Sequence, residues 1–294
     1  MLYELQNEYI AIKVDSFGAE LKSLRLNATN REYLWQADPA YWKRTSPILF
    51  PIVGRLWDHQ YRYKGNRYAM PQHGFARDKE FTLFYQDNKQ SIFLLEDDEE
   101  TRGNYPFRFR LFIQYTIEGC KVSVRWRVIN LSNKTMHFSI GSHPAFICPF
   151  TEEEEEEDCR LQFDANAGNT LLYKQLNDDY LCKNKADIIT LNNNQWSFQK
   201  HIFNKDVYIF ENYQIQEVSI LRKDDTPYLS IKFQAPVVGI WSPPKKQAPF
   251  ICIEPWFGRC DSEVFIGDLE EREYGNSLWG GAEFSTEYTI EIFK

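Results

Sequence analysis

The strongest constraint on the fold is a strict alternation of apolar and polar side chains in the middle of the chain. Apolar residues occupy every second position from Phe107 to Ile117 and again from Val122 to Val128, and Glu118-Gly119 separates the two runs. Successive side chains of a β-strand point to opposite faces, so this alternation is typical of strands buried on one side. We therefore expect a long antiparallel hairpin here.

Shorter segments repeat the pattern. Alternation recurs in Leu229–Phe233 and Tyr288–Phe293, and Lys64-Gly65-Asn66-Arg67 has the composition of a hairpin turn. Helix signals are few: Asp38–Trp42 has a proline at the first helical position, and a second short helix is expected over Leu269–Glu273. The sequence thus predicts an all-β protein whose 294 residues form a single domain, residues 1–294.

Charge and hydropathy exclude two classes of partner. The net charge is −8 and the basic residues are scattered, so we expect no nucleic-acid partner. Residues Met1 to Glu8 lack the features of a signal peptide, and no apolar run reaches membrane-spanning length, which predicts a cytoplasmic protein without a membrane partner. The acidic run Glu152–Glu157 is expected to be a solvated loop.

Three short segments contain residues suited to acid/base chemistry. They are Gln72–Asp78 with His73 and Arg77, Gly141–Pro144 with His143, and Ile253–Trp256 with Glu254. Two imidazoles, a guanidinium and a carboxylate can move protons near neutral pH without a metal or cofactor. Because the segments are far apart in the sequence, the fold would have to bring them together.

Two of these residues have competing interpretations. Pro144 restricts His143 to an extended backbone, which suits an oriented proton donor, but His137 shares its strand face and could be the working residue instead. Glu254 follows the apolar run Phe250–Ile253, which predicts a buried strand ending at Pro255-Trp256-Phe257-Gly258. The aromatic surroundings should raise the proton affinity of Glu254. The alternative for Glu254 is a structural ion pair with Arg259.

Seven segments occur in an order that resembles the aldose 1-epimerase (galactose mutarotase) family, in particular its LacX-like branch. The resemblance spans nearly the whole chain. The segments are Asn7 to Val14, Gly18-Ala19-Glu20-Leu21, Leu34-Trp35, Leu49-Phe50-Pro51-Ile52-Val53-Gly54-Arg55, Gln72-His73-Gly74-Phe75-Ala76-Arg77, Gly141-Ser142-His143-Pro144-Ala145-Phe146 and Cys252-Ile253-Glu254-Pro255-Trp256.

The resemblance implies a large antiparallel β-sandwich of the galactose mutarotase type (supersandwich) whose concave face holds a sugar. By motif, Glu254 corresponds to the base that takes the anomeric proton, and His143 to the acid that protonates the ring oxygen. His73 and Arg55 correspond to residues that bind sugar oxygens, and Asp206 is a looser match to an aspartate that contacts ring hydroxyls. The resemblance thus implies a mutarotase acting on a free aldohexose.

The sequence also departs from galactose mutarotases, which leaves the preferred sugar open. His73 is followed by Gly-Phe-Ala-Arg where those enzymes usually have Gly-Gly, and Glu254 is followed by Pro-Trp. Hexose-6-phosphate 1-epimerases, which belong to the same superfamily, share the His-Gly-Phe-Ala-Arg segment, so Arg55 and Arg77 could instead clamp a phosphate. Trp256 is a candidate apolar platform for a sugar ring.

A third alternative is a sugar-binding protein of the same fold without catalytic activity. Retention of a potential base and acid argues against it. No metal-binding His-Glu-x-x-His, dinucleotide-binding Gly-x-Gly-x-x-Gly or phosphate-binding loop motif is present, so we expect no cofactor and no metal. The expected partner is a small sugar, and the sequence does not decide between a monomer and a homodimer.

Overall fold

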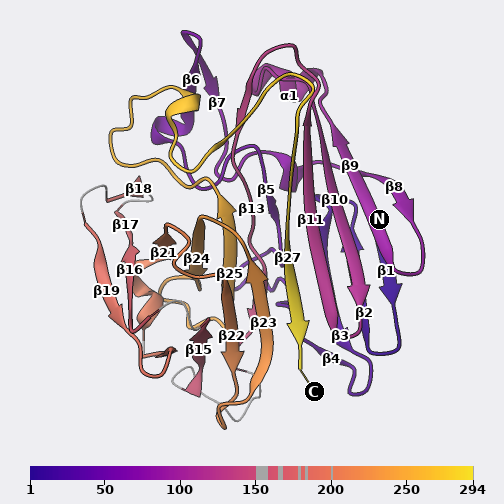
Figure 1. Ribbon diagram of the computed structural model, residues 1–294, viewed down its shortest axis with the longest axis vertical. Helices are drawn as coiled ribbons and strands as arrows, with labels where there is room; N and C mark the ends of the chain where they lie inside the picture. Colours follow the sequence, from indigo (N-terminus) through magenta and orange to yellow (C-terminus); the bar gives the residue numbers. More distant parts are fainter. Residues whose placement is uncertain (150–157, 165–167, 178–179, 183–184, 200, 294) are drawn as a thin grey trace.

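The computed structural model describes residues 1–149, 158–164, 168–177, 180–182, 185–199 and 201–293. The acidic run Glu152–Glu157 lies outside these residues. Two large sheets dominate the fold (Figure 1), and their ladders are antiparallel. No helix within the described ranges is long and apolar enough to cross a membrane.

The first large sheet has nine strands, and the last strand of the chain lies in its middle. In spatial order the strands are β20 (Gln195–Ser197), β15 (Arg160–Phe163), β22 (Glu217–Leu221), β23 (Pro227–Phe233), β27 (Glu283–Ile292), β11 (Lys121–Asn130), β10 (Phe109–Glu118), β9 (Gln90–Glu96) and β8 (Thr82–Gln86). Strand β27 pairs with β11 on one side and β23 on the other (Figure 1). It thereby joins the two halves of the chain in one sheet.

The second large sheet has eight strands and positions the candidate site. Its order is β19 (Asp187–Thr190), β16 (Thr170–Lys174), β21 (Tyr208–Glu211), β24 (Val237–Trp241), β25 (Phe250–Phe257), β13 (Ile140–Ser142) and β5 (Ile48–Leu49), with β14 (Ala145–Ile147) also paired to β25. Both β13 and β14 pair with the same side of β25, one after the other. Residues 143 and 144 lie in the break between them.

Smaller elements complete the fold. A four-stranded sheet contains β1 (Leu2–Gln6), β2 (Ile10–Asp15), β3 (Glu20–Leu26) and β4 (Arg31–Glu32). The strand pairs are β6 (Gln60–Tyr63) with β7 (Asn66–Ala69), β12 (Met136–Phe138) with β26 (Asn276–Leu278), and β17 (Leu176–Asn177) with β18 (Tyr180–Leu181). The helices are α1 (Glu99–Asn104) and the 3-10 turns η1 (Trp57–His59), η2 (Ala76–Asp78), η5 (Ile202–Lys205) and η6 (Leu269–Glu271).

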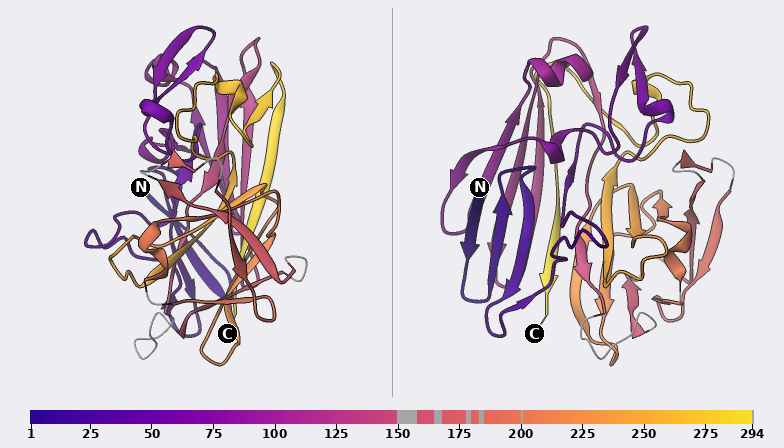
Figure 2. Two further views of the ribbon diagram at one scale, coloured as in Figure 1. Left: turned by 90° about the vertical axis from the view of Figure 1, so that its left-hand side faces the viewer. Right: turned by 180° about the vertical axis from the view of Figure 1, so that it is seen from behind.

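The predicted hairpins are confirmed. Strands β10 and β11 pair along their whole length, and the apolar positions of β10 are buried while Arg110 and Glu118 are exposed. Side chains such as Trp126, 1% exposed, enter a buried cluster that also contains Ile251 and Ile253 from the eight-stranded sheet. Each fully buried large apolar side chain contributes about 1.5–3 kcal/mol. Figure 2 shows the long strands of this hairpin from two further sides.

One helix prediction is wrong and one is partly right. Asp38–Trp42 forms a single turn in which Tyr41 and Trp42 donate their backbone N–H groups to the Asp38 carbonyl. So short a segment has no intrinsic helical stability, and contacts of Trp42 with the second sheet fix its path instead. The second expected helix is the single 3-10 turn η6.

Candidate active site

A cavity of about 210 Å³ contains every site residue that we singled out from the sequence. These are Arg55, His73, Arg77, His143, Asp206, Glu254 and Trp256. They come from segments across the first 256 residues of the chain, so the fold brings them together as the motifs require. The remaining lining residues are Trp42, Gly54, Gln72, Leu176, Val207, Ile209, Trp241 and Cys260.

Glu254 lies within strand β25, and its carboxyl group is buried. The strand places Cys252, Glu254 and Trp256 on its cavity face, while Ile251 and Ile253 enter the core on the other face. Glu254 is 1% exposed, and burial raises the pKa of its carboxyl well above the usual value, with the nearby Asp206 charge acting in the same direction. The site therefore favours the protonated carboxyl when no ligand is bound.

The strand ends within the predicted segment Pro255-Trp256-Phe257-Gly258. Strand β25 continues to Phe257, and Pro255 faces Val238 of β24. A proline is rare in a central strand because it cannot donate a ladder hydrogen bond. Here the opposite neighbour is interrupted between β13 and β14, so the missing N–H falls beside the break in the ladder.

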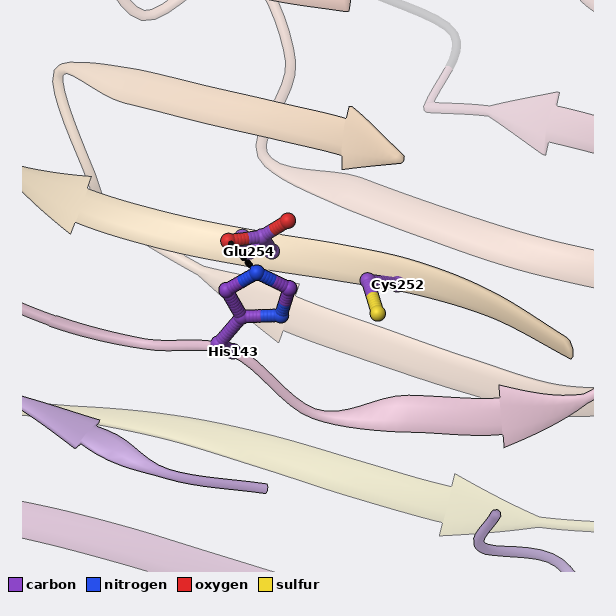
Figure 3. A group of neighbouring side chains, drawn as sticks. All are labelled: His143, Cys252 and Glu254. Atoms are coloured by element: carbon purple, nitrogen blue, oxygen red, sulfur yellow. Dashed lines mark ion pairs between the residues drawn. The ribbon is translucent and has the colours of Figure 1, made fainter. Parts of the chain in front are cut away.

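His143 enters the cavity from that break. Its backbone N–H donates to the Pro47 carbonyl at 3.1 Å, and the next residue, Pro144, accepts from the Ile253 N–H at 3.3 Å. These bonds bring the imidazole beside Glu254, with 3.2 Å between His143 Nε2 and Glu254 Oε2 (Figure 3). Burial is the main reason that the pKa of His143 falls to about 3, with the Arg77 charge adding to it.

The pair formed by Glu254 and His143 is therefore suited to hold one proton. Burial favours the neutral form of each group, which corresponds to a protonated carboxyl beside a neutral imidazole. The two heteroatoms are 3.2 Å apart, which is close enough for the proton to pass between them once a small side-chain rotation aligns the groups. A ligand that donates hydrogen bonds to the carboxylate would favour its transfer to the imidazole.

His73 has a defined tautomer. The Gly54 backbone N–H donates to His73 Nδ1 at 3.2 Å, and the His73 backbone N–H donates to the Gly54 carbonyl at 2.9 Å. Burial and the nearby Arg77 charge lower the pKa of His73 well below its usual value, so the ring is neutral. With Nδ1 as an acceptor, the proton sits on Nε2, which can donate to a ligand oxygen. Gly74 follows with φ +72° and leaves no space for a side chain against Phe50.

Three further charged residues, Arg55, Arg77 and Asp206, line the cavity wall. Arg77 donates to the Gln72 carbonyl at 2.6 Å, and the Asp78 carboxylate lies 3.7 Å from its Nε. Arg55 follows the Gly54 turn, and its carbonyl accepts from the backbone N–H of Asp261 at 2.9 Å. Asp206 has a strained backbone with φ 74° and ψ −151°, of the kind found at functional sites.

Trp256 forms part of the cavity wall because two neighbouring positions are glycine. A side chain at Gly141 on β13 would begin 2.7 Å from the indole, and one at Gly239 on β24 would begin at the same distance. Both contacts are shorter than real carbon contacts allow. The absence of side chains on both neighbouring strands therefore creates the space that the indole fills.

Cys252 was not singled out by sequence, although its period-two spacing from Glu254 was a usable signal. Its sulfur lies beside the His143 ring (Figure 3), and the ligand atoms of His143, Cys252 and Glu254 all lie within 4.8 Å of one another. Nitrogen, sulfur and oxygen ligands of this kind suit a divalent cation. However, burial raises the pKa of the Cys252 thiol well above its usual value, and metal binding would require its deprotonation.

The residues behind the two competing interpretations, His137 and Arg259, contact other partners. His137 lies on β12, where its Nδ1 contacts the Ser277 hydroxyl at 2.8 Å, and it does not line the cavity. Arg259 forms ion pairs with Glu211, at 2.7 Å, and with Glu273. Among the ion pairs of the described residues, the partner of Glu254 is His143.

Comparison with known proteins agrees with the fold and the arrangement of segments. Residues 1–261 match the family model for aldose 1-epimerase. The plasmid-encoded Protein LacX of Lactococcus lactis subsp. lactis is 31% identical over 279 residues, which cover 92% of this chain and 93% of the relative.

Two solved structures are also similar over nearly their whole length. A galactose mutarotase related enzyme from Lactobacillus acidophilus is 33% identical with a TM-score of 0.94, covering 100% of this chain and 98% of that one. A galactose mutarotase-like protein from Lactobacillus casei is 27% identical with a TM-score of 0.90, covering 100% of both chains. The β-sandwich is therefore of the galactose mutarotase type, and the chain belongs to the aldose 1-epimerase family.

Proposed function

We propose that this cavity interconverts the α and β anomers of a free aldohexose. The observation that carries the proposal is the buried contact of 3.2 Å between His143 Nε2 and Glu254 Oε2 at the cavity wall. The anomeric hydroxyl and the ring oxygen of a pyranose are bonded to the same carbon. An acid and a base that lie this close can therefore act on both oxygens at once.

In the proposed reaction, Glu254 accepts the proton of the anomeric hydroxyl while His143 Nε2 donates a proton to the ring oxygen. The bond between the anomeric carbon and the ring oxygen breaks and gives the open-chain aldehyde. Rotation about the adjacent carbon–carbon bond exposes the other face of the carbonyl, and the reverse transfers close the ring. Each proton transfer contributes about 10²- to 10⁴-fold to the rate.

The other cavity residues bind and orient the sugar in this proposal. The Nε2–H of His73 donates to a sugar oxygen, Arg55 and Arg77 donate to hydroxyls, and Asp206 accepts from one. Trp256 provides an apolar surface for one face of the ring. Since protons leave and return within the pair, the reaction needs no redox step and no cofactor.

A phosphorylated aldohexose is the second candidate, because two guanidinium groups line the cavity. Arg77 lies near Asp78, which is also 2.8 Å from Arg44, and this carboxylate offsets part of the positive charge. Asp206 places a further carboxylate in the cavity wall. Asp78 and Asp206 would compete with a phosphate for the two guanidinium groups, so the uncharged sugar is the first candidate.

Polarimetry on freshly dissolved α-glucose and α-glucose 6-phosphate tests both candidates. We expect the protein to accelerate mutarotation of the free sugar. A preference of a hundredfold or more for the phosphorylated sugar would reject the free aldohexose as the substrate in favour of the second candidate. Binding of either sugar without any acceleration would instead identify a non-catalytic sugar-binding protein.

A further inference from the structure

The orientation of the His143 ring is not fixed by a hydrogen bond from its second nitrogen to another residue. Nδ1 is buried and has no hydrogen bond to another residue within the described part of the chain. In acid/base and metal-binding histidines, a hydrogen bond to the second nitrogen usually sets the ring plane and the tautomer. Another contact must therefore hold Nε2 toward Glu254.

The indole of Trp42 makes such a contact. It lies over one face of the His143 imidazole, with 4.7 Å between ring centroids and 29° between ring planes. Trp241 meets the same imidazole nearly at right angles, at 5.2 Å and 86°. Two aromatic side chains on different sides leave the imidazole little freedom to rotate about its side-chain bonds.

Trp42 is itself held firmly in place. The Trp35 Nε1–H donates to the Trp42 carbonyl at 2.8 Å, and the Trp42 ring stacks on Phe250 at 5.9 Å and 28°. The chain then bends at Thr45, whose backbone N–H donates to the buried Glu20 carboxylate at 2.7 Å. The indole is thus fixed from both ends of its segment.

The segment that follows Trp42 is also bonded to the segment that contains His143. The His143 N–H donates to the Pro47 carbonyl at 3.1 Å, and the Ala145 N–H donates to the Thr45 carbonyl at 2.9 Å. The indole and the imidazole therefore belong to two chain segments that are held together by their backbones. A change in one segment would be transmitted to the other.

We propose that Trp42 is a positioning residue that holds the His143 imidazole in the plane from which Nε2 reaches both Glu254 and the sugar. Its stacked ring orients the imidazole in place of a hydrogen bond from Nδ1 to another residue. The catalytic consequence rests on the proposed mutarotase function, whereas the effect on the imidazole does not. Trp42 also lines the cavity, so its contribution to sugar binding must be separated from its contribution to turnover.

Steady-state kinetics of three variants make this separation. In Trp42→Leu we expect kcat to fall by about 10- to 100-fold with KM within about threefold, because a misplaced proton donor affects the transition state more than binding. Trp42→Phe keeps an aromatic ring over the imidazole, and we expect it to retain most of the activity. Trp279→Leu is the matched control, since Trp279 is 76% exposed and does not line the cavity. Circular dichroism and thermal unfolding would verify that each variant is folded.

Two kinetic outcomes would overturn the proposal. An unchanged kcat with a raised KM in Trp42→Leu would make Trp42 a sugar platform only. Equal losses in the folded Phe and Leu variants would show that stacking is not the relevant contact.

An NMR measurement tests the positioning without any activity. The chain has five histidines, so their imidazole ¹H–¹⁵N correlations can be assigned by substitution. We expect Trp42→Leu to change the His143 ¹⁵N shifts by more than the loss of the indole ring current can cause, because these shifts respond to the tautomer and to the contact of Nε2. The signals of His137, which lies outside the cavity, should stay unchanged. Unchanged His143 signals would refute the proposal even in a fully active enzyme. If Trp42→Leu alters the His143 signals but the wild-type protein shows no mutarotation, the proposed function is refuted and the positioning role of Trp42 is retained.

Discussion

Replacing Glu254 with glutamine separates the proposed base from every other role of this side chain. Glutamine has nearly the same size and retains hydrogen-bonding groups, but it cannot accept a proton near neutral pH. Loss of a general base lowers the rate by about 10²- to 10⁴-fold, equivalent to about 3–5 kcal/mol of transition-state stabilisation. Sugar affinity should change by less than about tenfold, because one hydrogen bond contributes about 1 kcal/mol.

The same substitution should stabilise the protein in a pH-dependent way. Burial raises the pKa of Glu254, so wild-type stability is highest below the unfolded pKa and decreases as the pH rises toward the folded pKa. Glutamine has no such dependence. We therefore expect Glu254→Gln to have a higher unfolding temperature than wild type, by a margin that is larger at pH 8 than at pH 5.

Polarimetry on a fresh α-anomer, sugar binding by calorimetry and thermal unfolding at the two pH values provide the measurements. Glu287→Gln is the control, because Glu287 is exposed on the other large sheet, where it pairs with Arg125 at 2.8 Å. The control should keep the wild-type rate. Equal mutarotation rates for wild type and Glu254→Gln would refute the assignment of Glu254 as the base. If the difference in unfolding temperature between the two proteins shrinks with rising pH, the raised pKa of Glu254 is refuted.

Three further predictions concern neighbouring positions. His143→Gln should lower kcat by about 10²- to 10⁴-fold in polarimetry, and a loss below tenfold would contradict its role as the acid. Asp206→Asn should move the low-pH limb of the kcat/KM profile to lower pH, because the Asp206 charge raises the pKa of the catalytic carboxyl; a shift to higher pH would contradict this cause. Gly74→Ala should destabilise the fold by about 2–4 kcal/mol in denaturant unfolding, through its positive φ and the clash with Phe50. Gly103→Ala, in α1 with open space around it, should be neutral or slightly stabilising, and equal losses for both would count against that reasoning.

Local patterns in the sequence were sufficient to predict the hairpin of β10 and β11, because a buried strand face leaves a period of two. The ordered motifs were sufficient to predict which side chains would line one cavity. The reason that β25 tolerates Pro255 could not be predicted, because it is a break in the neighbouring strand that β25 itself does not encode. The contact of Trp42 with His143 likewise joins two segments whose residues show no local sign of each other.

The two glycines beside Trp256 restrict how this binding surface can diverge among relatives. Any larger residue at Gly141 or Gly239 would displace the indole, and a smaller residue at 256 would leave a void on either side of its strand. Single substitutions at these three positions are therefore expected to disrupt the packing of the cavity wall, whereas simultaneous changes at all three can restore it. Redesign toward a bulkier sugar should treat the three positions as one unit and vary them in the same library.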